Sequence, residues 1–290
     1  MLEQSVNIGI IGFVHKKEVQ RILKRILTRF GKGNKFFIYE GIFERSPRYK
    51  IYSLNEIISS VSLIVSIGGD GTILALAREL RGKTIPVLPV KLGGLGFLTQ
   101  FTEDELFLHF SDILKGKGYL IEKRMMISGS LKGVSRSINF ECLNEVVVSK
   151  SSKSRMLKIK VSVDGKFLTQ LPSDGLIIST PTGSTGHSLS AGGPIIHPLQ
   201  DLFTITPICA HMLTNRPIVI PAASKISIEI ITKFSDVFIT IDGQVNYPVE
   251  EDDLIIVRKS PHRIHLIRQK DKDFFSVLRT KLGWGMEEKR

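Results

Sequence analysis

The chain has 290 residues, of which 42% are hydrophobic and 23% are charged, and its formal net charge at pH 7 is +12. That length allows one large domain or two ordinary ones, and a core of this size needs neither disulfides nor structural zinc. The two cysteines, Cys142 and Cys209, form no C-x-x-C pair, which argues against a disulfide scaffold and favours a reducing compartment.

No apolar run approaches the roughly 18–20 residues needed to span a bilayer, and no export signal is apparent at the amino terminus. We therefore expect a soluble cytoplasmic protein without a membrane partner. Lysines and arginines are scattered along the chain, without a block of like charges or a nucleic-acid motif. Because positive charge also attracts polyphosphate substrates, we expect an anionic small molecule rather than a nucleic acid as the partner.

Strand and helix patterns alternate through the first third of the chain. Continuous apolar runs predict strands at 6–14, 36–39, 61–67 and 86–90. Apolar residues at helical spacing predict helices at 16–30, 54–60, 72–80 and 106–114. This alternation is typical of an α/β domain, in which helices cover a parallel sheet.

A Lys-Gly-Lys-Gly segment at 115–118 ends that alternation, and short strands dominate after about residue 120. They are predicted at 145–148, 157–163, 176–179, 226–231, 237–241 and 254–258. Asp-Gly turn pairs at 164–165 and 242–243 separate some of them. The pattern predicts a second, all-β domain of antiparallel sheets, followed by a weakly helical or irregular tail at 271–284.

A glycine-rich loop joins the predicted strand at 61–67 to the next helix. It consists of Gly68, Gly69, Asp70, Gly71 and Thr72. Glycines let the backbone approach a phosphate closely, and amides at a helix start favour an anion. The loop is not a P-loop, because it lacks the Lys-Ser/Thr pair of a Walker A motif, and it is not a dinucleotide fingerprint, because it lacks the G-x-G-x-x-G spacing. Asp70 has two explanations that the residues alone leave equal: a base in proton transfer, or a helix cap.

A long stretch of small and hydroxyl residues follows the predicted strand at 176–179. Between Thr180 and Pro194 the only large apolar residue is Leu189. Such a density of hydroxyls and amides can bind the polar groups of a nucleotide, so we favour a binding site over a flexible surface loop. The pair Asn144 and Glu145 and the second glycine cluster at 93–97 are explained more simply, as a strand end and a tight turn.

Other site types find no support in the sequence. The seven histidines show no H-E-x-x-H or similar spacing, so we expect no metal site built by protein ligands. Ser188 and Ser190 lie outside any G-x-S-x-G elbow, which argues against a serine hydrolase.

Taken together, these segments resemble the NAD kinase family. The loop at 68–72 is similar to its first signature, which diacylglycerol and sphingosine kinases share and which is related to a phosphofructokinase loop. Asp174-Gly175, followed by 179–185, 190–194 and His197-Pro198, is similar to the glycine- and hydroxyl-rich motif specific to the family. Further similar segments follow in the family's order: Asn144-Glu145, Thr206-Pro207-Ile208 with His211, Arg216-Pro217, Asp242-Gly243-Gln244 and Leu282-Gly283-Trp284.

The resemblance implies a Rossmann-like or phosphofructokinase-like α/β domain at 1–119 and an antiparallel, β-sandwich-like NAD-binding domain at 120–267. A tail at 268–290 would return to the first domain. The implied reaction phosphorylates the 2′-hydroxyl of the adenosine ribose of NAD to give NADP, with ATP or polyphosphate as donor. Mg²⁺ or another divalent cation would be held largely by substrate phosphates and water. A homodimer or homotetramer is implied as well.

The resemblance also implies roles for individual residues. Asp70 corresponds to the general base, and Gly71 is its neighbour in the NAD site; Gly68, Gly69 and Thr72 belong to the phosphate loop. Asn144 and Glu145 match the pair that holds the adenosine ribose, and Asp174 matches an acidic residue near the nicotinamide end. The adenine and ribose wall corresponds to Thr185, Gly186, His187, Ser188, Leu189 and Ser190, with Arg155 and Gln244 as additional contacts.

Two positions depart from the family pattern. Many members have Ala-Tyr where this chain has Gly186-His187, so an imidazole replaces any aromatic packing by tyrosine. Many also have an asparagine where Lys91 stands, a position from which a lysine can contact a phosphate. Three alternatives stay open on the sequence: a lipid or sugar kinase that uses the shared pentad, a catalytically silent nucleotide sensor, and a basic nucleic-acid-binding protein. The donor range, the use of NADH and feedback by NADP or NADPH are open too.

Overall fold

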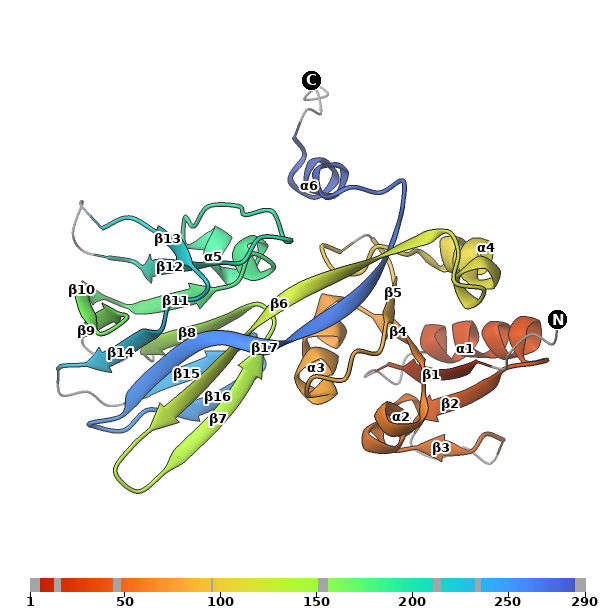
Figure 1. The fold of residues 1–290 in the computed structure, drawn as a ribbon, viewed down its shortest axis with the longest axis horizontal. Helices are drawn as coiled ribbons and strands as arrows, with labels where there is room; N and C mark the ends of the chain where they lie inside the picture. Colours follow the sequence, from red (N-terminus) through yellow and green to blue (C-terminus); the bar gives the residue numbers. More distant parts are fainter. Residues whose placement is uncertain are drawn as a thin grey trace. The chain divides into compact units, whose positions relative to one another are not determined.

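The protein is described from a computed structural model, which covers residues 6–12, 17–43, 48–94, 96–150, 156–210, 215–232 and 236–284 (Figure 1). The chain divides into two compact units. Unit 1 comprises Met1–Lys123 and Ile264–Arg290, and unit 2 comprises Arg124–Arg263.

Unit 1 contains a parallel sheet in the order β5-β4-β1-β2-β3. Its strands are β1 (Asn7–Ile11), β2 (Lys35–Tyr39), β3 (Ile51–Tyr52), β4 (Leu63–Gly68) and β5 (Val87–Lys91). The last part of β17 (Leu254–Gln269) continues this sheet, because Leu266 pairs with Val87 of β5 in parallel. Every residue of β4 is buried, as expected for a central strand with both faces covered.

The helices of unit 1 are α1 (Lys17–Phe30), α2 (Leu54–Ser60), α3 (Asp70–Leu80), α4 (Glu103–Leu114) and α6 (Phe274–Leu282), with a 3-10 turn η1 (Glu40–Ile42). α1 forms because Val19, Ile22, Leu23, Ile26 and Phe30 recur at helical spacing, and all five are buried. Both α2 and α4 begin with a capping box, which satisfies amides that the first turn leaves open.

Unit 2 consists of antiparallel strands in two sheets. One sheet has the order β13-β12-β11-β8-β15-β16, and the other runs β10-β9-β14-β17, with β6 and β7 added through β17. The strands are β6 (Tyr119–Lys132), β7 (Ser137–Cys142), β8 (Glu145–Lys150), β9 (Leu157–Val163), β10 (Lys166–Ser173), β11 (Gly175–Ser179), β12 (Leu202–Ile208), β13 (Ile218–Pro221), β14 (Ile226–Ile230), β15 (Val237–Ile241) and β16 (Val245–Pro248). Two short helical segments, η2 (Gly183–Thr185) and α5 (His187–Ser190), follow β11.

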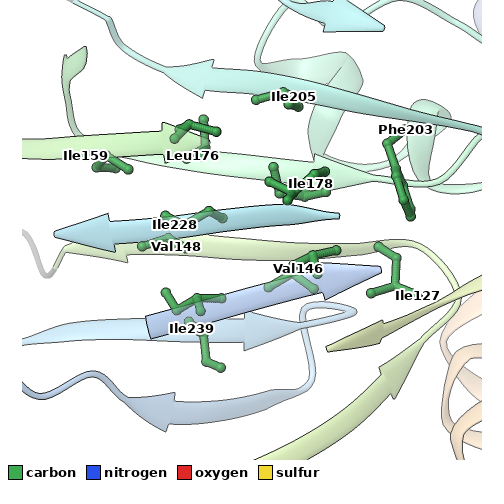
Figure 2. Close-up of a cluster of buried hydrophobic side chains, with 14 of the residues drawn as sticks. Ile127, Val146, Val148, Ile159, Leu176, Ile178, Phe203, Ile205, Ile228 and Ile239 are labelled. Atoms are coloured by element: carbon green, nitrogen blue, oxygen red, sulfur yellow. The ribbon is translucent and has the colours of Figure 1, made fainter. Parts of the chain in front are cut away.

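The two sheets of unit 2 share one apolar core. Figure 2 shows side chains from both, with Val146, Val148, Leu176, Ile178 and Ile205 from one sheet and Ile159 and Ile228 from the other. Alternate residues of β15 are buried, which is the pattern of a strand with one face on a core. This arrangement holds the residues that precede β8 and follow β11 on a rigid base.

The predicted fold class is confirmed: a parallel α/β region is combined with antiparallel β-sheets. Several predicted boundaries are wrong, among them the start of the helix predicted from residue 106, which begins at Glu103, and two differences have a clear physical cause. The helix expected from residue 72 begins at Asp70, because Gly69 is already the cap residue. The strand expected to end at residue 258 continues to Gln269, through Pro261. Proline lacks an amide donor and usually marks the end or the edge of a strand, so the residues around Pro261 did not predict that this strand would continue.

The remaining predicted elements agree in type. The first strand runs from Asn7 to Ile11, and residues 13–14 of the predicted range lie outside the described residues. The tail forms a helix, α6, whose Val277 and Leu278 are buried. In the described part of the chain, every helix is too short or too polar to cross a membrane.

Candidate functional site

The glycine loop lies at the carboxyl end of β4, where α3 begins. Gly68 is the last residue of β4 and Gly69 is the N-cap of α3, without a side chain to accept from the first amides of the helix. A Cβ at Gly68 would overlap the side chain of Thr72, so glycine is needed there for close packing. The cap explanation of Asp70 is therefore wrong, because Asp70 is the first residue inside the helix.

The Asp70 carboxylate is held by the segment that follows β5. Its Oδ2 accepts a hydrogen bond from the amide of Phe97 at 2.9 Å. Its Oδ1 accepts from the amide of Leu98 at 3.3 Å, from the amide of Thr99 at 3.1 Å and from the Thr99 hydroxyl at 2.8 Å. The carboxylate is thus fixed in orientation by donors 27 to 29 residues further along the chain.

Gly96 makes this arrangement possible. A Cβ at Gly96 would overlap both the Asp70 carboxylate and the Thr99 hydroxyl. The second glycine cluster was predicted to be only a tight turn, and that prediction missed its contact with the first loop. The glycines themselves were the only signal in the sequence, since three of the four donors are backbone amides and the fourth is the hydroxyl of an ordinary threonine, Thr99.

In unit 2, a buried aspartate organises the residues ahead of β8. Asp242 accepts hydrogen bonds from the amides of Leu143 at 3.2 Å, Asn144 at 2.7 Å and Glu145 at 3.3 Å. It has a φ of 50°, a left-handed conformation that aspartate tolerates better than most residues. Gln244 lies in the same turn, between β15 and β16, with an exposed side chain.

Asn144 and Glu145 present buried oxygens to the segment that contains Gly186 and His187. Glu145 Oε2 and Asn144 Oδ1 are buried and have no hydrogen-bond partner among the described residues. A Cβ at Gly186 would stand 3.1 Å from Glu145 Oε2, and Nδ1 of His187 lies 3.7 Å from Glu145 Oε1. Buried acceptors without donors are uncommon in folded proteins, and ligand hydroxyls would satisfy them.

The ionisation of Glu145 is strongly perturbed. Burial of the carboxyl group, with a smaller contribution from the nearby Asp242 carboxylate, raises the pKa of Glu145 from 4.5 to about 8. The side chain is 5% exposed, so solvent does little to screen these effects. At neutral pH this carboxyl is therefore mostly protonated in the ligand-free protein.

We expect Glu145→Gln to change stability in a pH-dependent way. The folded pKa lies above the unfolded value, so the wild-type protein loses stability as pH rises from about 5 to above 8, whereas glutamine does not titrate. The variant should match the wild type at pH 5 and exceed it at pH 9 by on the order of 2–4 kcal/mol. Urea unfolding at both pH values measures this difference.

A control for that experiment is Glu251→Gln, which neutralises an exposed carboxylate of the same unit. It should leave the pH dependence of unfolding close to that of the wild type. An equal effect of Glu145→Gln at pH 5 and pH 9 would contradict the assignment of the raised pKa to Glu145.

The other residues of the predicted adenine and ribose wall lie in η2 and α5. Ser188 is buried, and its hydroxyl contacts the Thr206 hydroxyl at 3.1 Å, so it anchors α5 to β12. Thr185 donates to the carbonyl of Thr182 at 3.2 Å. Leu189 is half-buried, whereas His187 and Ser190 are exposed.

Asp174 lies at the other end of the same pair of strands. It precedes β11 and forms an ion pair of 3.0 Å with Lys150, the last residue of β8. β8 and β11 are antiparallel, with Ser179 opposite Glu145 and Gly175 opposite Ser149. At about 3.3 Å per residue, Asp174 and Glu145 are therefore roughly 17 Å apart along the sheet. Lys150 was missed in the sequence, where it looks like any strand-end lysine.

Two further predictions concern Arg155 and a metal. Arg155 lies outside the described residues. Among the residues that the structure describes, no group of three or more His, Cys, Asp or Glu is placed to hold a metal ion.

Known proteins match nearly the whole chain. The sequence model of the ATP-NAD kinase N-terminal domain matches residues 44–118, and that of the ATP-NAD kinase C-terminal domain matches residues 143–269. NAD kinase from Geobacter metallireducens is 42% identical over 279 residues, which cover 96% of this chain and 98% of that protein. NAD kinase from Geobacter sp. (strain M21) is 45% identical, with coverage of 96% and 98%.

Solved structures share the fold. A crystal structure of yeast NADH kinase complexed with NADH has a TM-score of 0.86 and 25% identity, and covers 98% of this chain and 89% of that chain. A crystal structure of an NAD kinase from Archaeoglobus fulgidus in complex with ATP has a TM-score of 0.74 and 23% identity, with coverage of 96% and 98%. With relatives more than 40% identical over nearly its full length, the chain belongs to the NAD kinase family and is a phosphotransferase.

Proposed function

We propose that the protein transfers the γ-phosphoryl group of ATP to the 2′-hydroxyl of the adenosine ribose of NAD, which yields NADP and ADP. The observation that carries this proposal is the carboxylate of Asp70, fixed at the start of α3 beside a glycine loop suited to phosphates. The family membership supports NAD as the acceptor, and the ATP complex of the Archaeoglobus relative supports ATP as the donor.

The general base in this proposal is Oδ2 of Asp70. A carboxylate has about four lone-pair positions, two on each oxygen. Three donors crowd Oδ1, from Leu98 and Thr99, whereas Oδ2 accepts one hydrogen bond, from Phe97. Oδ2 therefore keeps a position at which it can accept the proton of the ribose hydroxyl.

The phosphate loop would bind the donor. Gly68 and Gly69 keep side chains away from the loop, and the start of α3 carries the positive end of the helix dipole. Phosphoryl transfer proceeds through a loose transition state, so positioning and charge stabilisation contribute most of the rate. Gly71 and Thr72 extend the loop into the first turn of the helix.

NAD would be held by unit 2. The unpartnered oxygens of Asn144 and Glu145 would accept hydrogen bonds from ribose hydroxyls, and the segment Thr185–Ser190, with Gln244 and Arg155 as further contacts, would line the adenosine end. Asp174, paired with Lys150, would mark the nicotinamide end, because a separation of roughly 17 Å along the sheet suits an extended dinucleotide.

A divalent cation fits this site as a companion of ATP. The loop offers one carboxylate as a metal ligand, that of Asp70, and hydrogen bonds already fill most of its acceptor positions. This fits Mg²⁺, which is commonly held by substrate phosphates and water with only one or two carboxylates. The loop residues 68–72 would hold it together with the donor phosphates. When bound, Mg²⁺ supplies neutralisation of phosphate charge.

The wider proposal follows the family resemblance. The α/β domain at 1–119 would carry the base, the β-rich domain at 120–267 would bind NAD, and the tail at 268–290 would return to the first domain. The enzyme would act in the cytoplasm as a homodimer or homotetramer.

Formation of NADP from NAD and Mg-ATP by the purified protein tests the proposal. A dehydrogenase that accepts only the 2′-phosphate detects the product, and GTP and polyphosphate serve as alternative donors. We expect NADP with ATP, and no phosphorylated product when a diacylglycerol replaces NAD. Binding of NAD without NADP formation from any donor would instead indicate a silent nucleotide sensor.

A further inference from the structure

Lys91 is fixed next to the phosphate loop by the backbone of β5. It is the last residue of this strand and lies opposite Gly68 in the β4–β5 pairing. Its amide donates to the carbonyl of Phe101 at 2.8 Å, and the amide of Leu92 donates to the carbonyl of Gly68 at 3.2 Å. The position of the Lys91 side chain is thus set by the strand that precedes the second glycine cluster.

The ammonium group of Lys91 stands directly over the loop. Nζ is 3.4 Å from the point that a Cβ would occupy at Gly69. An anion bound to the first amides of α3 would therefore meet this ammonium, because Gly69 is the N-cap of that helix.

Lys91 has no counter-charge within the part of the chain that the structure describes. Glu103, which borders the same cavity, is paired with Arg21 and Arg25. Asp70 is engaged by the amides of residues 97–99 instead. No described carboxylate lies within ion-pair distance of Lys91 Nζ.

The electrostatics of the ligand-free protein are unfavourable at this point. A cation near the amino end of a helix is repelled by the helix dipole, and Lys91 is only partly exposed to water. A bound anion would offset both the repulsion by the helix dipole and the cost of partly burying the Lys91 charge. Lysine is a compact point charge with three donors, and it serves as a phosphate ligand in other nucleotide sites.

Space for such an anion is available beside Lys91. A cavity of about 540 Å³ is bordered by α1, by the residues that follow β5 and by the start of α4. Lys91, Leu92 and Gly93 form one part of its wall, and Lys91 and Leu92 are also the residues that pair with Gly68 at the start of the phosphate loop. The other charged residues of the wall are Glu18, Arg21, Arg25, Glu103 and Asp104.

We propose that Lys91 is a binding residue for the phosphate chain of the phosphoryl donor. The inference rests on the phosphoryl transfer proposed above and adds a contact that is not part of the glycine loop itself. The donor is favoured over the pyrophosphate of NAD because Lys91 Nζ lies next to Gly69, in the loop that is proposed to bind the donor phosphates.

The test compares Lys91→Met with the wild-type enzyme. Because a hydrogen bond between charged groups is lost, KM for ATP should rise roughly 10- to 100-fold, with kcat changed only a few-fold and KM for NAD unchanged. Calorimetry without NAD should show the same loss in ATP affinity and no loss in the affinity for adenosine, which has no phosphates. Lys91→Arg should restore most of the ATP affinity, because the charge returns.

Lys83→Met is the matched control. Lys83 is an exposed lysine of the same unit, between α3 and β5, so its replacement removes the same charge away from the loop. It should leave all of these constants near wild-type values. Lys91→Gln provides a polar second variant with the same expected loss, and thermal unfolding checks that each variant is folded.

Three results would overturn the inference: an unchanged KM for ATP, an equal rise in KM for NAD, or an equal loss of adenosine affinity. A wild-type protein that makes no NADP would refute the proposed function instead. Even then, the calorimetric comparison of ATP with adenosine would still decide whether Lys91 binds phosphates.

Discussion

Asp70→Asn should lower the turnover of NAD phosphorylation by about 10²–10⁴-fold, which is the usual contribution of a general base. Asparagine keeps the size of the side chain but cannot accept the hydroxyl proton. The affinity for NAD should change little, because the substitution leaves Asn144, Glu145 and the segment Thr185–Ser190 of unit 2 in place. Steady-state kinetics give the turnover, and equilibrium binding of NAD gives the affinity.

Asparagine also disturbs the hydrogen bonds around the loop, so the prediction needs a control. If the amide nitrogen takes the place of Oδ2, it faces the amide of Phe97, and one hydrogen bond is lost. Thr99→Val removes a different donor, the hydroxyl that binds Oδ1 at 2.8 Å, and leaves Oδ2 untouched. Turnover should fall less than about tenfold in Thr99→Val. Beside the large loss in Asp70→Asn, this result would distinguish the role of Asp70 as a base from the role of the hydrogen bonds that orient it. Equal losses in both variants would assign Asp70 a positioning role only.

Gly96→Ala should lower turnover by about 100-fold without the loss of any chemical group. The added methyl group would occupy the space of the Asp70 carboxylate and the Thr99 hydroxyl, so the carboxylate must move. A displacement of about 1 Å at a reacting group costs roughly that factor. The measurement is kcat with saturating NAD and ATP, together with a thermal unfolding curve.

Gly94→Ala is the matched control for this substitution. It makes the same change two residues earlier, where a Cβ would have no neighbour within 4 Å. We expect activity near that of the wild type. Normal activity in Gly96→Ala would show that the Asp70 carboxylate does not depend on the geometry of the second glycine cluster.

The sequence predicted the fold class because its hydrophobic periodicity is local. Continuous apolar runs predicted β4 and β5, and apolar residues at helical spacing predicted α1, because both patterns lie within a single element and need no knowledge of tertiary contacts. The shared core of the two sheets in unit 2 was not predictable in the same way. It depends on which strands pair, and β8 pairs with β11 and β15, far apart in the chain.

The site was predicted only in part, for a related reason. The glycines around Asp70 predicted an anion-binding loop, but the donors that orient Asp70 are three backbone amides and the Thr99 hydroxyl, 27 to 29 residues away. The closeness of His187 to Glu145, and the raised pKa of Glu145, depend on burial and on Asp242 from another turn. Long-range hydrogen bonds and desolvation leave no periodic pattern in a sequence.

Unit 1 is discontinuous in the chain, and this has a consequence for biosynthesis. Its last sheet contact, made by Leu266 of β17, and its buried Ile267 come after the whole of unit 2. Lys272, which donates to the carbonyl of Gln100 and pairs with Glu105, is later still. At about 5–20 residues per second, a ribosome needs roughly 7–30 s to make residues 124–263. During that interval the nascent α/β unit carries an unfilled sheet edge at β5, so it is the stretch of synthesis in which chaperone binding would matter most.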